Sequence, residues 1–572
     1  MSMYGSPGGS ELSNVPRAHQ ACMSCRKQKR KCNKALPACS LCERMNRPCD
    51  YSEVTPPPTH EDFNALRMKL LDLESRLTGA NGGGAALNPP IAYPATPGSV
   101  GIPTDTLGPP VGFSALQESP WQGIQNTFPV IAFLDGETFR YGRIAVPIPN
   151  IDIPVDVLEL LGDGASIQGA LTDYFATIHR WIPIVSQKRM TRNMVNPLWE
   201  AGPDLALLFL CMKLITSRPQ DGIGCAQNPI YLSAKRFITL METSGMVSLI
   251  VLQANLMVTL YEYGQAIYPA AWMSSGWNIR YGNMLGINTF EFTSQLLGRS
   301  ATWTEQEERK RTWWGVLLVD RMLSLGGQSH IITNQEPKDT DLLPVDDAAW
   351  DEGNMTQGIA KTGETPYSEQ VAPFPRLCQV SHLLGKIFVH HDATFPSDKD
   401  RFDDASRLFE KATSLSRILQ EEATDNDYVS LSAAIALSFS AICAVCDPYS
   451  CPKTVTGHTD VSTETAEAQL QAIDGLKRAS QNIVEFAERL NTVMPLPQDV
   501  DRISPFIMDA MYCAAANHAW WVRESGDANS QLALDNLRNC LRRLGTRWRN
   551  AAEYLRILEA QEFTYAIGGA GP

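Results

Sequence analysis

The 572-residue sequence lacks the short motifs that mark several enzyme classes: a G-x-S-x-G nucleophile elbow, an H-E-x-x-H zinc helix, a P-loop and a G-x-G-x-x-G loop after a strand. It also lacks runs of alternating apolar and polar residues with regular hairpin signals, which argues against a β-sandwich or barrel. The first residues, MSMYGSPGGS, contain no apolar stretch typical of a signal peptide. We therefore expect a non-enzymatic chain that is not secreted and whose cysteines stay reduced.

Basic residues are outnumbered by acidic ones, 49 to 62, which gives the chain a net charge of −13. The exception is residues 17–50, where nine Lys and Arg face two acidic residues, which gives this segment +7 and leaves −20 on the rest. Nucleic acid would repel the chain as a whole and attract this segment. The asymmetry therefore predicts a polyanionic partner for the N-terminal part alone.

The chain is too long for one ordinary core, so we expect at least two independently packed parts. Helical periodicity dominates beyond the first quarter, and the predicted fold class is mainly α, with a large all-α domain over residues 151–565. Residues 428–446 contain no charge and approach the length of a membrane span. Four serines interrupt them and Asp427 and Asp447 flank them, which favours a buried helix over a transmembrane one.

Six cysteines lie in residues 21–51 with the spacing C-x2-C-x6-C in each of two halves: Cys22, Cys25, Cys32, Cys39, Cys42 and Cys49. Each tetrahedral zinc ion needs four ligands, so six thiolates can satisfy two zinc ions only if two thiolates bridge both metals. The neighbouring cations would lower the thiol pKa values and offset the residual negative charge. Ser40 and Glu43 form an S-x-x-E pattern, which predicts a capping box at the start of a second-half helix.

This segment resembles the fungal Zn2Cys6 binuclear-cluster transcription factors, with Pro37 in the expected loop. The resemblance implies two zinc ions bridged by Cys22 and Cys39, a nuclear location and double-stranded DNA with CGG half-sites as the partner. It places Lys29 at the main base-contacting position, where a lysine can donate to guanine O6 and N7. The basic run of the first half and the loop after it supply the other expected DNA contacts, of which several resemble phosphate contacts: Arg26, Lys27, Arg30, Lys31 and Lys34.

Residues 52–60 form a Pro-rich spacer, and residues 61–78 contain a short heptad seam of Phe63, Leu66, Leu70, Leu73 and Leu77. Two heptads are marginal in isolation, and the alternative is an amphipathic helix docked on its own chain. The family resemblance favours a coiled-coil homodimer. We expect disorder in residues 1–20 and in the Pro/Gly-rich linker 79–150, where scattered aromatics form either an activation segment or a partial docking contact with the next domain: Trp121, Phe128 and Phe133.

Two segments resemble the fungus-specific middle homology domain, the first at 173–190 and the second running from 260–287 into 307–325, together with LLPVDDAAW at 342–350. The resemblance implies a regulatory domain, which in some relatives senses a small-molecule effector. Four aromatic residues could line a ligand pocket, but we expect them to lie in the hydrophobic core: Tyr261, Tyr263, Trp313 and Trp314. The acids and bases of residues 305–311 lie at helix-neighbour spacing, which predicts a solvated, ion-paired face.

The sequence offers two further sets of candidate metal-binding or reactive residues outside the cysteine segment. His390, His391 and Asp392 could offer metal ligands, but no further cluster supports them, and three cysteines near an apolar helix are expected to be buried structural thiols: Cys443, Cys446 and Cys451. The sequence therefore predicts a zinc-dependent, dimeric regulator of RNA polymerase II transcription that works with the transcription machinery, mostly as an activator of a metabolic or secondary-metabolite gene cluster. The alternatives are a nuclear interaction or metabolite-sensing scaffold and a helical enzyme with a DNA tether.

Overall fold

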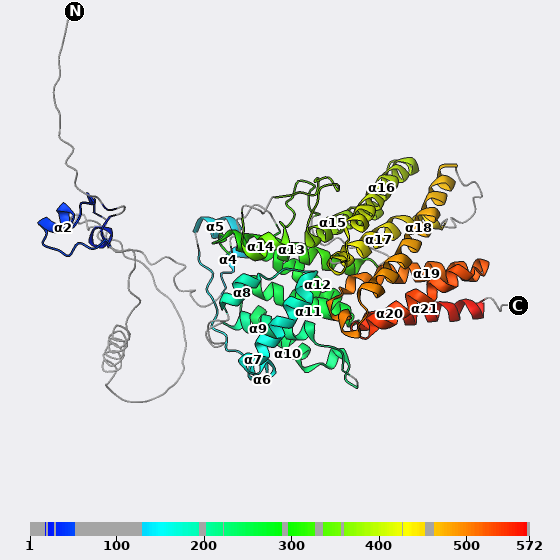
Figure 1. Cartoon of the computed structure of the whole chain (residues 1–572), viewed down its shortest axis with the longest axis horizontal. Coiled ribbons are helices and arrows are strands. Elements are labelled where there is room, and N and C mark those ends of the chain that lie inside the picture. The colour runs from blue at the N-terminus through cyan, green and yellow to red at the C-terminus, as the bar shows by residue number, and fades with distance from the viewer. Residues whose placement is uncertain are drawn as a thin grey trace, which may run out of the picture. The chain divides into compact units, whose positions relative to one another are not determined.

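The computed structural model describes residue 18 and residues 21–27, 30–51, 128–142, 144–193, 202–220, 222–288, 296–326, 336–355, 360–425, 427–451 and 463–568. The chain divides into two compact units, Met1–Ser114 and Ala115–Pro572 (Figure 1). Within the described ranges there is no β-strand, and one isolated antiparallel bridge joins Leu342 to Thr362. The predicted, mainly α fold class is therefore confirmed.

The smaller unit contains two five-residue helices, α1 (Met23–Lys27) and α2 (Ser40–Arg44). Its described core consists of cysteine sulfurs rather than aliphatic side chains, since Cys22, Cys25, Cys39 and Cys42 are at most 3% exposed. So small a module cannot bury enough apolar surface to fold by the hydrophobic effect alone, which is the situation in which structural metals supply the folding free energy.

The larger unit is built from helices joined mostly by short loops. Its α-helices are α4 (Ile131–Leu134), α5 (Gly136–Gly142), α6 (Val155–Leu161), α7 (Gly164–Ala176), α8 (Gln187–Asn193), α9 (Pro203–Thr216), α10 (Pro229–Thr243), α11 (Leu249–Gly264), α12 (Ala270–Leu285), α13 (Trp303–Ser324), α14 (Asp347–Glu352), α15 (Pro373–Asp392), α16 (Asp398–Glu422), α17 (Tyr428–Ser450), α18 (Thr463–Val493), α19 (Met508–Ser525), α20 (Ala528–Gly545) and α21 (Arg549–Gly568). The 3-10 helices are η2 (Ile178–Arg180), η4 (Cys225–Gln227), η5 (Pro497–Arg502) and η6 (Pro505–Ile507).

Helix α11 is the centre of the first half of this unit. Ser248 caps it by accepting a hydrogen bond from the Ile250 N–H, and residues 251–264 are all buried. A helix that is buried on every side must be surrounded by others, and α11 packs against α9, α10, α12 and α13.

Helix α17 has the same role in the second half, where it packs against α15, α16, α18 and α19. By length and composition α17 could cross a membrane, but 83% of its most apolar window is buried inside the protein. The expected buried helix is therefore confirmed. Its central position explains the uncharged run at 428–446, because no face of the helix meets solvent.

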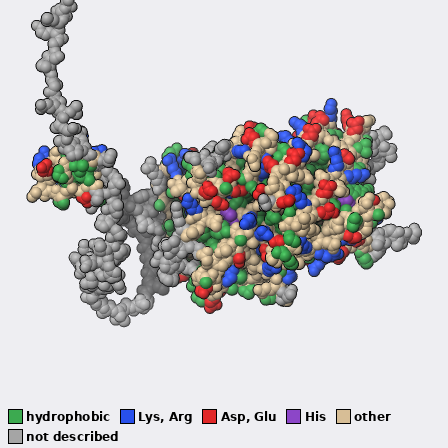
Figure 2. Space-filling view, in the orientation of Figure 1, with side chains coloured by type: hydrophobic (Ala, Val, Ile, Leu, Met, Phe, Trp, Pro, Cys, Tyr) green, Lys and Arg blue, Asp and Glu red, His purple; other side chains and the backbone are tan. Residues whose placement is uncertain are grey.

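The two halves share one continuous apolar core that extends from Val157 to Leu558. Helix α13 contacts α15, and α11 contacts α21, so the C-terminal helices pack back onto the first half (Figure 1). The face of this unit shown in Figure 2 carries interspersed acidic and basic side chains, as expected of a soluble surface without a strong field of one sign.

The ion pairing predicted at the start of α13 is confirmed, whereas the prediction that this face is solvated is wrong for most of its charges. Arg309 and Glu305 do form a partly exposed i, i+4 pair at 2.7 Å. In contrast, Glu307 and Arg311 are 1% and 0% exposed, and the Arg311 guanidinium also reaches Asp347 at 2.8 Å. The partners come from a loop and helix more than thirty residues away, so helix-neighbour spacing could not show that these charges are buried.

The prediction for the aromatic residues is confirmed, because Tyr261 and Tyr263 of α11 and Trp313 and Trp314 of α13 are 1% or 2% exposed core residues. Cys443 and Cys446 are buried as expected, whereas Cys451 is exposed and departs from that expectation.

The ring nitrogens of His390 contact Asp404 and Tyr449, each at 2.7 Å, so the structure gives this histidine partners within the protein. Helices α4 and α5 lie in the segment expected to be linker. Phe128 and Phe133 of this segment line a cavity together with residues of the large domain, which agrees with the expected alternative of a partial docking contact.

Candidate metal centre and nucleic-acid interface

The first two cysteines of each half lie at the start of a short helix. Cys22 precedes α1 and Cys25 lies within it, while Cys39 precedes α2 and Cys42 lies within it. The two-residue spacing brings both thiols of a pair to the same helix end. Cys32 and Cys49, the last cysteine of each half, are half-buried and close the cluster from the segments that follow the helices.

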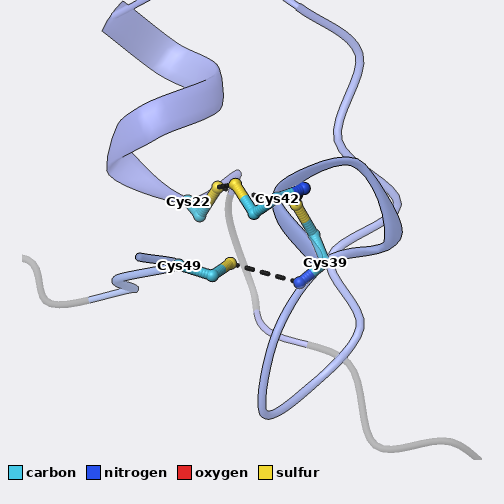
Figure 3. A group of neighbouring side chains, drawn as sticks. All are labelled: Cys22, Cys39, Cys42 and Cys49. Carbon is cyan, nitrogen blue, oxygen red and sulfur yellow. Dashed lines mark hydrogen bonds between the residues drawn. The ribbon is translucent and has the colours of Figure 1, made fainter. Parts of the chain in front are cut away.

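The six sulfurs form two groups of four, and within each group the atoms lie within 4.8 Å of one another. One group is Cys22, Cys25, Cys32 and Cys39, and the other is Cys22, Cys39, Cys42 and Cys49. Figure 3 shows the second group, with its side chains converging from α2 and from both ends of the module. The two groups share Cys22 and Cys39.

The sulfur separations fit zinc. Sγ of Cys22 lies 3.8 Å from Sγ of Cys39 and 3.6 Å from Sγ of Cys42, and the Cys25 and Cys39 sulfurs are 3.7 Å apart. A Zn–S bond of about 2.3 Å in a tetrahedron gives an S–S edge of about 3.8 Å. Thiolates are ligands that zinc prefers, and the surroundings hold the sulfurs at the required spacing without a disulfide.

Backbone N–H groups point at several sulfurs. The Cys42 N–H donates to Sγ of Cys39 at 3.4 Å, the Cys39 N–H donates to Sγ of Cys49 at 3.1 Å, and the Lys34 N–H donates to Sγ of Cys32 at 3.4 Å. Such donors stabilise a thiolate over a thiol. They also offset part of the negative charge that six thiolates leave around two divalent ions.

The thiol pKa values reflect a balance between burial and these donors. Burial raises the pKa of Cys39, but the Cys42 N–H and the neighbouring thiols outweigh burial and lower the pKa to about 6. Burial, together with hydrogen bonds with Cys39 and Cys32, raises the pKa of Cys25 to about 12, although a hydrogen bond with Cys22 lowers it. Of the two sulfurs that belong to both groups, Cys39 has a lowered thiol pKa, whereas burial raises the pKa of Cys22.

The predicted capping box at Ser40 is wrong. Cys39 is the N-cap residue of α2 and its sulfur accepts the hydrogen bond that a serine oxygen would otherwise take. Ser40 instead exchanges two hydrogen bonds with Asn33, one from its own N–H and one to its hydroxyl. The S-x-x-E pattern misled because the metal ligand occupies the capping position one residue earlier.

Contacts outside the sulfurs close the module. The Tyr51 hydroxyl donates to the Ala35 carbonyl at 2.8 Å and lies 4.0 Å from Sγ of Cys32. The Met23 N–H donates to the Asp50 carbonyl at 2.8 Å, which ties the start of α1 to the end of the module. Sequence reasoning missed Tyr51, although its place two residues after the last cysteine was a usable signal. Contacts of this kind orient metal ligands.

The predicted DNA-contacting residues fall into three groups. Arg30 and Lys31 are exposed just after α1, and the Arg30 N–H continues the helical turn by donating to the Cys25 carbonyl at 3.0 Å. Lys34 has a φ of 60°, in the loop where its N–H reaches Cys32. Arg26 and Lys27 belong to α1, but their side chains lie outside the described residues, as does Lys29 altogether.

The predicted dimer seam, Phe63, Leu66, Leu70, Leu73 and Leu77, also lies outside the described residues. Arg44 and Arg47 in the second half are exposed, but so are Glu43 and Asp50, so these charges balance. The excess of positive charge lies in the first half, as the sequence indicated.

Comparison with known families agrees with this geometry. Residues 20–57 match the fungal Zn(2)-Cys(6) binuclear cluster domain, and residues 171–432 match the fungal specific transcription factor domain. The apolar core continues well past residue 432, so α18–α21 complete a domain whose family match ends within α17. No solved structure matches the chain.

Among curated proteins, the chain is 34% identical over 182 residues to the transcription factor BOA15 of Botryotinia fuckeliana, which covers 31% of this chain and 97% of that protein. It is 22% identical over 565 residues to the pigment biosynthesis transcriptional activator pigB of Monascus ruber, covering 95% and 94%. It is also 22% identical over 396 residues to the citrinin biosynthesis transcriptional activator mrl3 of Monascus ruber, covering 65% and 73%.

These matches account for both units. The cysteine cluster is a binuclear centre for two zinc ions and the module that binds DNA, and the helical unit contains the domain that accompanies this module in transcription factors. A transcription factor implies a nuclear location and no enzymatic activity. The chain therefore belongs to the fungal Zn(2)-Cys(6) binuclear-cluster transcription factors that carry a fungal-specific transcription factor domain.

Proposed function

We propose that this protein is a nuclear activator of RNA polymerase II transcription that binds CGG-containing sites as a zinc-dependent homodimer. The observation that carries the proposal is the pair of sulfur groups that share two cysteines, with a run of five cations in six residues between Cys25 and Cys32. The metal cluster would hold that run as a rigid element, and rigid presentation is what base recognition in the major groove requires.

In this proposal Cys22 and Cys39 bridge the two zinc ions and the other four cysteines each bind one. Membership in both sulfur groups supports the bridging role, and the N–H donor to Cys39 supports it further, since a bridging thiolate must share its charge between two metals. Cys25 and Cys32 then complete one tetrahedron, and Cys42 and Cys49 complete the other.

Lys29 would read the guanine edges, and the remaining cations would contact phosphates and set the register. The exposure of Arg30 and Lys31 beside α1 supports a phosphate-facing surface at this end of the module. The residues proposed to contact phosphate are Arg26, Lys27, Arg30, Lys31 and Lys34.

A homodimer through Phe63, Leu66, Leu70, Leu73 and Leu77 would place two such modules on one DNA molecule. Binding of the second module then becomes intramolecular, which raises its effective concentration and with it the affinity for paired half-sites. The spacer 52–60 would limit the half-site separations that both modules can reach.

The target genes are proposed to form a secondary-metabolite cluster. The support is that two similar chains carry names for activators of pigment and citrinin biosynthesis, and one of them matches almost end to end. Mapping where the full-length protein sits on its own genome tests this proposal. Occupancy confined to genes outside any biosynthetic cluster would contradict it.

The DNA-binding proposal is tested by fluorescence anisotropy of the full-length protein on duplexes with paired CGG sites and on scrambled duplexes. Lys29→Ala should reduce the preference for CGG by about 1–3 kcal/mol, whereas Arg26→Ala should weaken both duplexes alike and reduce the salt slope by about one. Arg417→Ala removes an exposed arginine of α16 and serves as the charge-matched control.

Removal of zinc with a chelator should abolish CGG preference in the same assay. Equal affinity for CGG and scrambled duplexes in the zinc-loaded protein would overturn the proposal. So would affinity that does not change with salt, because phosphate contacts release counterions and weaken steeply as salt rises.

A further inference from the structure

A cavity of about 1270 Å³ opens on the larger unit between α12, the C-terminal ends of α10 and α13, and the segment around α4. The described residues that line it all belong to the unit Ala115–Pro572. Its size suits an organic molecule of several fused rings, because ligand sites of this kind are usually a few hundred to about a thousand Å³. The helices supply a fixed floor, and Phe128 and Phe133 form one wall.

The floor of the cavity is aromatic, and hydrogen bonds hold its rings in place. The rings of Trp277 and Tyr281 are stacked with centroids 4.4 Å apart. The Trp277 indole N–H donates to Glu242 at 3.0 Å, and the Tyr281 hydroxyl donates to the Met246 carbonyl at 2.7 Å. Tyr281 is 6% exposed and covers one face of the Trp277 ring, so the half-buried Trp277 is the ring on which a flat aromatic partner can stack with an offset.

The rim exposes apolar side chains that a ligand would cover. Trp272 is 51% exposed, Met273 is 63% exposed and Phe133 is 66% exposed. All three line the cavity, so this is a contiguous apolar patch rather than scattered surface residues. Methionine sulfur adapts to aromatic surfaces of varied outline, which suits a site that takes a large planar molecule.

Two residues that line the cavity carry hydrogen-bond acceptors with capacity for a further donor. Oδ1 of Asn283 is buried and has no hydrogen-bond partner in the part of the chain that the structure describes. The Asp320 side chain is 19% exposed, receives one hydrogen bond from the Ser275 hydroxyl at 3.2 Å, and stays 3.8 Å from the Arg321 guanidinium. Burial raises the pKa of Asp320, as expected of a carboxyl with few donors.

The cavity also contains a position where a side chain could be added without a clash. A Cβ built on Gly276 of α12 meets no atom within 4 Å, whereas one built on Gly282 of the same helix meets the Trp313 ring at 2.7 Å. Gly276 therefore borders open space, and a larger residue there would occupy the site that a ligand needs.

From these contacts we infer that this cavity binds a neutral, planar, polycyclic aromatic molecule whose hydroxyl groups donate to Asp320 and Asn283. A flat ring can stack on Trp277, and hydroxyl groups can donate to Oδ1 of Asn283 and to the remaining lone pairs of Asp320. Two acids, Asp320 and Glu242, line the site against one base, Arg280, and this net negative charge disfavours an anionic ligand. The role of this ligand as an effector of transcription rests on the proposed function, but its binding does not.

Isothermal titration calorimetry of the full-length protein tests the inference with 2,6-dihydroxyanthraquinone and its 2,6-dimethoxy ether. The dihydroxy compound should bind one to one, and the ether should bind roughly ten-fold more weakly, because it lacks the donors. Gly276→Leu should abolish binding. Gly169→Leu changes an exposed glycine of α7 that also has no atom near its Cβ position, and it should bind like the wild type.

Asp320→Leu should weaken the dihydroxy compound roughly ten-fold and leave the ether unchanged. The inference is overturned if neither compound binds, if both bind equally, or if Gly276→Leu binds as the wild type does. It is also overturned if a peptide of residues 115–127 fills the cavity and excludes the anthraquinones. Anisotropy on CGG duplexes with the same preparations reports the proposed function separately, so loss of one leaves the other measurable.

Discussion

Arg547 joins the two ends of the larger unit, and its replacement should destabilise that unit far more than replacement of a neighbouring arginine. Its side chain is 2% exposed. The guanidinium donates to the carbonyls of Ile215 and Ser217, pairs with Asp501 at 3.3 Å and lies 4.1 Å from the Trp548 ring centroid. Ile215 and Ser217 end α9, where the last carbonyls have no partner within the helix.

The magnitude follows from what Arg547→Met would leave behind. The methionine restores part of the volume, but each of the two carbonyls loses a buried donor, at about 1–3 kcal/mol each. Asp501 keeps its pair with Arg218 and its charge is not stranded. The loss in free energy of unfolding should therefore total about 3–5 kcal/mol, in the range for breaking a buried charged contact.

Arg218→Met is the matched control, because Arg218 binds the same carboxylate but its side chain is 49% exposed. An exposed pair contributes little, so the expected loss is below about 1 kcal/mol. Urea unfolding followed by tryptophan fluorescence measures both variants in the full-length protein. All twelve tryptophans lie in the unit Ala115–Pro572, so the zinc module is silent in this signal. Equal losses for the two variants would refute the reasoning.

Three further predictions concern the metal centre and the helix packing. Cys39→Ala should reduce the zinc content of the purified protein from two ions to nearly none, while Cys25→Ala should retain about one, because Cys39 belongs to both sulfur groups and Cys25 to one. Inductively coupled plasma analysis would contradict this by finding equal content in both variants. Zinc affinity should fall as pH falls, and the slope of its logarithm against pH should steepen by about one proton below about pH 6. Cys39, with its pKa of about 6, is protonated there and must also lose its proton to bind the metal, whereas Cys25, with its pKa of about 12, releases a proton on either side of pH 6. Competition with a chromophoric chelator measures that slope, and a single slope across pH 6 would argue against the N–H donor to Cys39. Gly282→Ala should cost about 1–3 kcal/mol of unfolding free energy because its Cβ meets Trp313, while Gly276→Ala should stabilise α12 by up to about 1 kcal/mol. Urea unfolding that ranks them in the opposite order would contradict the packing of α12.

Much of the fold followed from patterns that are local in the chain. The uncharged run of α17 predicted a buried helix, and the aromatic residues of α11 and α13 predicted core positions, because a helix with no polar face has no way to meet solvent. Local patterns failed at Glu307 and Arg311. The spacing looked like a solvated face, and the partners that allow burial, such as Asp347, come from a distant segment.

In the zinc module, too, local patterns predicted some features correctly and missed others. Spacing alone predicted six ligands and two zinc ions, since the number of thiolates and the coordination of zinc require sharing. The capping pattern of Ser40 misled, because Cys39 takes the cap with the sulfur that also belongs to both ligand groups. A sulfur acting as an N-cap leaves no signature in spacing, so only the folded geometry showed it.

By itself the sequence determined the ligand set, the helical class and the placement of positive charge at one end, because these depend on residue identity and on periods of a few residues. The folded arrangement decided which charges are buried, how Arg547 reaches α9 more than three hundred residues earlier, and where α12 leaves an aromatic cavity. Those features depend on which distant segments supply hydrogen-bond partners and packing surfaces, and no local period in the chain encodes such pairings.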